Sequence, residues 1–218
     1  MIVFKNLYHR YIREYYALYD INLKIEKGEK VSLVGEDDSG KTSLIRILSK
    51  LEKPSSGEVY INGKSIKNIN FKTDISVGYL PVCPIFLNRK TVYDNLKYIL
   101  KSQKITKEDI DNKINDAIKV FDLEEIKNKK IKELTLFEKY IVSIARLSLR
   151  KIDLLLVDNV FEGLEDNQIN ILLNLIEKHI ISKENTVIIA TSCSSLTENL
   201  TTRKIYFKSG SIVDSLED

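Results

Sequence analysis

GEDDSGKT, at residues 35–42, matches the pattern GxxxxGK(S/T). Residues 31–34 before it are largely apolar and predict a short buried strand, and residues 41–51 carry apolar side chains at helical spacing. A glycine-bounded loop between a strand and a helix presents backbone N–H groups that can surround a phosphate, and the helix dipole adds to this attraction. The sequence therefore predicts a phosphate-binding loop.

The residue types within this loop have separate expected tasks. Gly35 and Gly40 permit backbone angles that a side chain would resist. Lys41 is expected to reach the β- and γ-phosphates of a nucleotide, and the Thr42 hydroxyl is expected to bind Mg²⁺. The predicted ligands are therefore ATP and Mg²⁺.

Two sets of carboxylates bear on the expected phosphate site: one at the end of a later strand and one within the loop itself. Asp158 follows the apolar residues 154–157, and a carboxylate at the end of such a strand would hold Mg²⁺, often through water. In contrast, Glu36, Asp37 and Asp38 place three negative charges beside a polyanion. We expect them to weaken nucleotide affinity without abolishing it, because solvent and salt screen exposed charges.

Composition limits the class of protein. Of the 218 residues, 43% are hydrophobic and 30% are charged, with a net charge of +3, which is typical of a globular chain. Lysines are scattered among acidic residues, so we expect no nucleic-acid partner.

Cys83 and Cys193 lie far apart, which disfavours a disulfide framework or zinc site and suggests a reducing compartment. No signal peptide or membrane-spanning run of about 20 apolar residues is evident.

Alternating strand and helix patterns predict an α/β fold. We expect a P-loop NTPase core with a mainly parallel sheet, an N-terminal antiparallel β portion and a helical insertion. The expected division is a core of about residues 1–84 and 151–218 and a helical subdomain of about residues 85–150. Helical patterns cover 92–101, 107–121, 138–150 and 166–181, and strand patterns cover 58–61, 76–80, 154–157 and 186–190.

Several landmarks make the chain resemble the nucleotide-binding domains of ABC-type transporters over nearly its whole length. Tyr11 stands where that family stacks an aromatic ring on adenine. Residues 53–64 are similar to the family's hairpin, residues 77–81 and 91–96 resemble the segments around its Q-loop, and 144–146 read Ile-Ala-Arg like its signature helix. The resemblance implies one ATP-binding domain. The expected nucleotide-binding residues are Tyr11, Gly35, Glu36, Asp37, Asp38, Ser39, Gly40, Lys41, Thr42 and Ser43, and the expected metal ligands are Thr42 and Asp158.

Departures from the family pattern indicate weak or absent hydrolysis, with no catalytic residue intact. Val82 replaces the Q-loop Gln, Asn159 replaces the catalytic Glu, and Ser192 replaces the switch His. Residues 134–138 read LTLFE in place of LSGGQ. An amide is not a usable base, and general-base assistance is worth about 10²–10⁴ in rate. A lost preorganised donor commonly costs about 10²–10³.

The resemblance also implies partners. ABC domains form head-to-tail dimers in which one chain's phosphate loop meets the other's signature, so a homodimer or a heterodimer is expected. A membrane permease is the second expected partner, which would place the chain in the cytoplasm, peripheral on the inner face of the cell membrane. The apolar residues Ile85, Phe86 and Leu87 are the expected contact with the permease.

Other functions remain open at this point. The chain could be an active ABC-type ATPase whose altered positions are compensated, or a non-transport ABC regulatory protein acting on DNA or ribosomes. The non-transport class usually has long coiled coils or fused domains, and neither pattern is found here. A P-loop kinase or GTPase is disfavoured by Tyr11 and by the Ile-Ala-Arg helix.

Overall fold

The computed structural model of the chain describes residues 1–12, 15–101, 106–160 and 162–216. The chain divides into two compact units. The first comprises residues 1–79, 153–159 and 182–218, and the second comprises residues 80–152 and 160–181. The whole phosphate-binding loop therefore lies in the first unit.

A mainly parallel sheet of six strands has the order β10-β9-β3-β8-β7-β6. Its central strands β3 (Lys30–Val34), β8 (Thr186–Thr191) and β7 (Leu154–Asp158) run parallel, and every residue of β7 and β8 is buried. Continuous apolar runs suit this position because helices or a second sheet cover both faces of parallel sheets. The flanking strands are β6 (Val77–Leu80), β9 (Arg203–Lys208) and β10 (Ser211–Val213).

An antiparallel sheet with the order β2-β1-β4-β5 completes the first unit. Strands β1 (Ile2–Ile12) and β2 (Tyr15–Ile25) pair along most of their length, with several register shifts, and β1 also pairs with β4 (Ser56–Ile61). The turn to β5 (Lys64–Ser65) has positive φ at both Asn62 and Gly63, which is the backbone that the Asn-Gly pair predicts.

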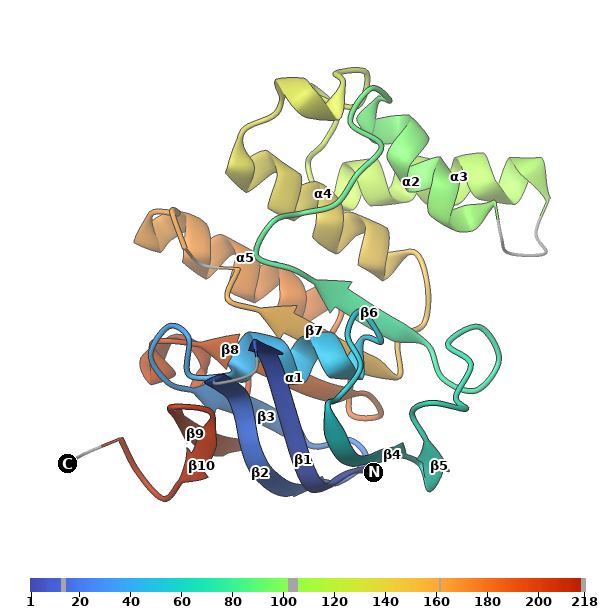
Figure 1. Ribbon diagram of the computed structural model, residues 1–218. Helices are drawn as coiled ribbons and strands as arrows, with labels where there is room; N and C mark the ends of the chain where they lie inside the picture. The colour runs from blue at the N-terminus through green and yellow to red at the C-terminus, as the bar shows by residue number, and fades with distance from the viewer. Residues whose placement is uncertain (13–14, 102–105, 161, 217–218) are drawn as a thin grey trace. The chain divides into compact units, whose positions relative to one another are not determined.

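Helix α1 (Lys41–Leu48) joins the two sheets into one core (Figure 1). It contacts β2 of the antiparallel sheet and β7 and β8 of the parallel sheet. The helix ends three residues before the predicted bound of 51, because Lys50 adopts a left-handed conformation (φ 60°) that terminates the helix. The core cluster draws apolar residues from both sheets and from the helix, among them Phe4, Leu18, Ile45, Leu156 and Phe207.

Helices dominate the described part of the second unit (Figure 1). Helix α4 contacts α2, α3 and α5, so α4 is the centre of this group. The helices are α2 (Val92–Leu100), α3 (Lys107–Val120), α4 (Leu136–Ser148) and α5 (Asp166–His179). A short 3₁₀ turn at Ile131–Glu133 also belongs to this unit, and another at Ser194–Thr197 belongs to the first unit. Together with the two sheets, these helices confirm the predicted fold class. Among the residues described, no helix has the length and apolar character needed to cross a bilayer.

Candidate nucleotide-binding site

The phosphate-binding loop joins the end of β3 to the start of α1. At Gly35 and Gly40 the neighbouring backbone is so close that a side chain would not fit. A Cβ on Gly35 would lie 2.3 Å from the Phe207 carbonyl oxygen. A Cβ on Gly40 would lie 2.4 Å from the Ala17 carbonyl oxygen, and Gly40 also has a φ of 104°. No other residue fits either position without moving the backbone. The loop is thus held tightly against β2 and β9.

The Lys41 side chain lies within the loop and is hydrogen-bonded to three of its groups. Its Nζ donates to the carbonyl oxygens of Gly35 at 2.7 Å and Glu36 at 2.6 Å, and to Ser39 Oγ at 2.9 Å. Burial lowers the pKa of Lys41, while the nearby charges of Asp37, Asp158 and Asp38 act in the opposite direction. An ammonium has three donors, so a phosphate oxygen that binds Lys41 must replace one of these acceptors.

Thr42 and Asp158, the expected metal ligands, lie next to each other in the first unit. Thr42 Oγ1 donates to Asp158 Oδ1 at 2.8 Å, and the Tyr79 hydroxyl donates to Asp158 Oδ2 at 3.2 Å. Burial raises the pKa of Asp158, and the bonds from Thr42 and Tyr79 partly offset this rise. A hydroxyl and a carboxylate are hard oxygen ligands, and Mg²⁺ at nucleotide sites takes its remaining ligands from phosphates and water. The residues present therefore fit Mg²⁺.

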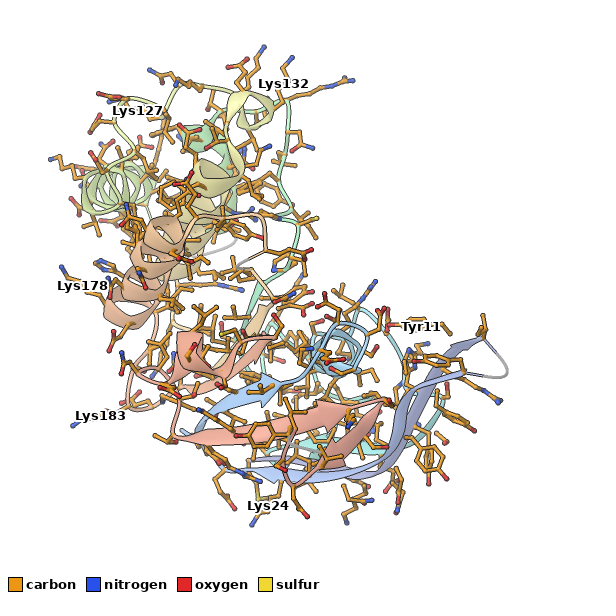
Figure 2. All side chains as sticks on the ribbon, turned by 90° about the vertical axis from the view of Figure 1, so that its left-hand side faces the viewer. Tyr11, Lys24, Lys127, Lys132, Lys178 and Lys183 are labelled. Carbon is orange, nitrogen blue, oxygen red and sulfur yellow. The ribbon has the colours of Figure 1, made fainter. Side chains whose placement is uncertain are left out.

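A cavity of about 460 Å³ opens beside the loop. Tyr11 forms part of its wall: the side chain leaves β1 and reaches the side of α1 (Figure 2), where its hydroxyl lies 3.1 Å from Ser43 Oγ. The cavity is large enough to admit more than a phosphate group. Its lining comprises Tyr11, Tyr15, Ala17, Asp37, Asp38, Ser39, Gly40, Lys41, Thr42, Ser43, Arg46 and Asn159.

The three acidic residues of the loop are exposed. Asp37 and Asp38 line the cavity. Together with Glu36, they also line a second cavity of about 430 Å³ beside the C-terminal strands. Exposure lets water and salt screen their charges, which is consistent with the expected weakening, not loss, of affinity. The binding roles assigned to the loop residues stay predictions.

The structure places the altered catalytic positions in different settings. Asn159 lines the cavity directly after Asp158 and has a left-handed φ of 42°. Ser192 is exposed just after β8 and is not part of the cavity lining. Val82 belongs to the second unit, where its carbonyl accepts a hydrogen bond from the Tyr140 hydroxyl. None of these three side chains is a base.

Four residues of the site escaped the sequence analysis. Arg46 lies one helical turn after Thr42 on α1, so helical spacing alone could have placed it at the cavity. Tyr15 and Ala17 belong to β2, and Tyr79 belongs to β6, so only the fold brings them to the loop. No local pattern marks these three residues.

A glycine-bounded loop at a helix N-terminus, with a carboxylate at the end of another parallel strand of the same sheet, is typical of P-loop nucleotide-binding proteins. The chain belongs to the ABC transporter family, because the family model described as "ABC transporter" matches residues 18–162. The matched residues include both the phosphate-binding loop and Asp158.

Relatives and solved structures agree with this assignment. The chain is 27% identical to the methionine import ATP-binding protein MetN 2 of Bacillus cereus, over 98% of this chain and 65% of that protein. It thus spans less than two thirds of that relative's length. The MetN protein of Legionella pneumophila is 34% identical over 74% of this chain and 49% of its own length. The ATP-binding cassette MJ0796, solved as a dimer bound to ADP and Pi, superposes with a TM-score of 0.85 at 24% identity, with both chains fully covered, and shares the fold.

Proposed function

We propose that the chain binds Mg-ATP at the phosphate-binding loop, couples that binding to a membrane permease, and hydrolyses ATP slowly or not at all. The observation that carries this proposal is the contrast between two neighbouring residues. Asp158 is buried and hydrogen-bonded to Thr42, so the two expected metal ligands lie side by side, whereas the next residue, Asn159, lines the cavity without a basic side chain. Mg²⁺ bound there would neutralise charge on the phosphates.

The start of α4 supports the expectation of weak hydrolysis. In a head-to-tail dimer this helix N-terminus would face the partner's nucleotide. Here the Glu138 carboxylate already occupies the helix N-terminus as part of the cap. Its Oε2 accepts from the Thr135 backbone N–H at 2.7 Å and from Thr135 Oγ1 at 3.0 Å. A fixed carboxylate and an exposed Leu136 both oppose the approach of a polyanion. The chain therefore combines a poor signature with a missing base.

The segment at residues 85–87 supports the permease contact. Ile85 and Leu87 are exposed by 70% and 44%, although both are apolar. Arg146 fixes the segment, because its guanidinium donates to the Ile85 carbonyl at 2.6 Å and lies 4.9 Å from the centre of the Phe86 ring. A fixed, exposed apolar loop suits a protein partner. Bound to a permease, the chain would be peripheral on the cytoplasmic face of the membrane.

Calorimetry with Mg-ATP tests the proposal directly. The wild type should bind, and Lys41→Ala should lose most of the affinity, because Lys41 is the cation that reaches the phosphates. Lys72→Ala is the matched control, since Lys72 is an exposed lysine of the same unit. Equal affinity in the wild type and Lys41→Ala would refute the phosphate-loop assignment.

A further inference from the structure

Tyr11 is held more firmly than its exposure suggests. The residue is 57% exposed, at the far end of β1 from the core. Even so, its hydroxyl donates to Glu52 Oε2 at 2.8 Å. Because a tyrosine hydroxyl has only one proton, the Ser43 hydroxyl at 3.1 Å must donate to the Tyr11 oxygen. The Tyr11 ring is thus anchored at its outer end.

Glu52 is itself held by an ion pair with Arg46 and lies close to His9. Arg46 Nε lies 2.9 Å from Oε1, and His9 Nε2 lies 3.1 Å from Oε2. The Glu52 side chain is only 15% exposed, so its carboxylate is largely shielded from solvent although Arg46 is 45% exposed. The His9 contact is close, but its geometry is not that of a hydrogen bond, and among described residues no hydrogen-bond partner is found for either ring nitrogen. Glu52 therefore has a defined orientation toward Tyr11.

His9 also supports the ring of Tyr11. The two ring centres are 4.8 Å apart and the planes meet at 82°, an edge-to-face contact that aromatic rings favour. His9 is buried. Burial raises the pKa of Tyr11, so its hydroxyl remains a donor to the carboxylate. Tyr11 is therefore held at its ring and at its hydroxyl.

The same helix holds both ends of the cavity. Lys41 and Thr42 begin α1 at the phosphate loop, whereas Ser43 and Arg46 contact Tyr11 and Glu52 from its first turns. The phosphate side and the Tyr11 side of the cavity therefore share one rigid support. An aromatic ring fixed in this way can stack on a planar base at a smaller entropic cost than a mobile one.

We propose that Glu52 is a positioning residue for the nucleoside part of the ligand: it fixes the Tyr11 ring at the cavity wall so that a heterocyclic base stacks on it. This inference rests on the proposed binding of ATP. It predicts that Glu52 contributes to the affinity for a nucleotide but not to the affinity for a bare polyphosphate.

Calorimetry with Mg-ATP and with Mg-tripolyphosphate separates the two contributions. The wild type should prefer ATP, and Tyr11→Ala should lose roughly 5- to 150-fold in ATP affinity, the range found for base–aromatic stacking. Glu52→Ala should lose about three- to tenfold for ATP, and Tyr11→Phe should lose a similar amount because it keeps the ring but not the anchor. Tripolyphosphate affinity should stay unchanged in all three variants.

Two further variants make the test specific. Glu58→Ala removes another carboxylate that accepts a tyrosine hydroxyl, from Tyr60 at 2.8 Å, and should leave both affinities unchanged. The double variant Glu52→Ala with Tyr11→Phe should bind ATP no more weakly than either single variant, because both remove the same contact.

Several outcomes would overturn the inference. Equal losses for ATP and tripolyphosphate would mean that Glu52 acts on the fold or on the phosphate site. Unchanged ATP affinity in Glu52→Ala, or additive losses in the double variant, would remove its link to Tyr11. A wild type that binds both ligands equally well would refute recognition of the base, although the assignment of the phosphate-binding loop would still hold. A wild type that binds neither would refute the proposed function as well.

Discussion

At the scale of single residues, Tyr79 shows how the fold supplies a contact that no motif predicts. Its hydroxyl donates to Asp158 Oδ2 at 3.2 Å, and burial raises the pKa of Tyr79 well above its usual value. The phenol therefore stays protonated and remains a donor at neutral pH. Asp158 is fully buried, so each of its carboxylate oxygens needs a partner. Thr42 supplies the other one.

Tyr79→Phe should therefore destabilise the protein in the absence of nucleotide. Leaving a buried carboxylate oxygen without its donor costs about 1–3 kcal/mol. Urea unfolding should show a lower midpoint with an unchanged slope. Tyr98→Phe is the control, since Tyr98 is 59% exposed and should tolerate the change. Equal stability of Tyr79→Phe and the wild type would mean that the bond contributes nothing.

At the scale of elements, the start of α4 changes the interpretation of residues 134–138. The sequence of this stretch predicts an altered signature and a helix that begins at 138. The structure begins α4 at Leu136, with Thr135 as its N-cap and Glu138 completing a capping box. The cap explains why a hydroxyl and a carboxylate stand three residues apart, whatever their role toward a partner.

Thr135→Ala should lower the free energy of unfolding by about 1 kcal/mol, the usual cost of losing an N-cap side chain. Thr135→Ser keeps the hydroxyl, and serine is at least as good an N-cap as threonine, so this variant should be as stable as the wild type. Chemical denaturation of the three proteins, compared in one buffer, measures both differences. If the alanine variant is as stable as the serine variant, the cap does not stabilise α4.

Local signals account for the elements that the sequence predicts well. Thr106 caps α3 as expected, accepting from the Asp109 backbone N–H at 3.1 Å, and the apolar run before Asp158 forms β7. The glycine pattern and Lys41 likewise locate the phosphate loop. Tyr15, Tyr79 and Glu52 could not be assigned, because their contacts are with side chains and loops that are distant in the chain. Long-range contacts of this kind leave no periodic trace in the sequence.

At the scale of the whole molecule, the altered positions are spread over both units. Asn159 and Ser192 belong to the first unit, and Val82, Leu136 and Phe137 belong to the second. In the proposed head-to-tail dimer, each site combines one chain's loop with the other's signature. A homodimer would therefore carry every defect at both sites. A heterodimer with an intact partner would carry the missing base at one site and the poor signature at the other.

Hydrolysis by the purified chain should therefore be far below the ordinary enzyme range of about 1 s⁻¹ and above. Asn159→Glu alone should recover little, because groups that act as a unit on one phosphate are strongly non-additive. Its backbone adds to the difficulty: at a φ of 42°, asparagine is tolerated, whereas glutamate is strained by about 1 kcal/mol.

Restoring the whole set should gain far more than any single change. The combined variant carries Val82→Gln, Leu136→Gly, Phe137→Gly, Asn159→Glu and Ser192→His. Two glycines in the first turn of α4 cost about 1 kcal/mol each, so folding must be checked by circular dichroism before activity is compared. Steady-state phosphate release from the wild type, Asn159→Glu and the combined variant, with Lys41→Ala as background, gives the comparison. Wild-type turnover of about 1 s⁻¹ or more would show that other residues supply the base, in which case the chain is a working ATPase with compensated positions.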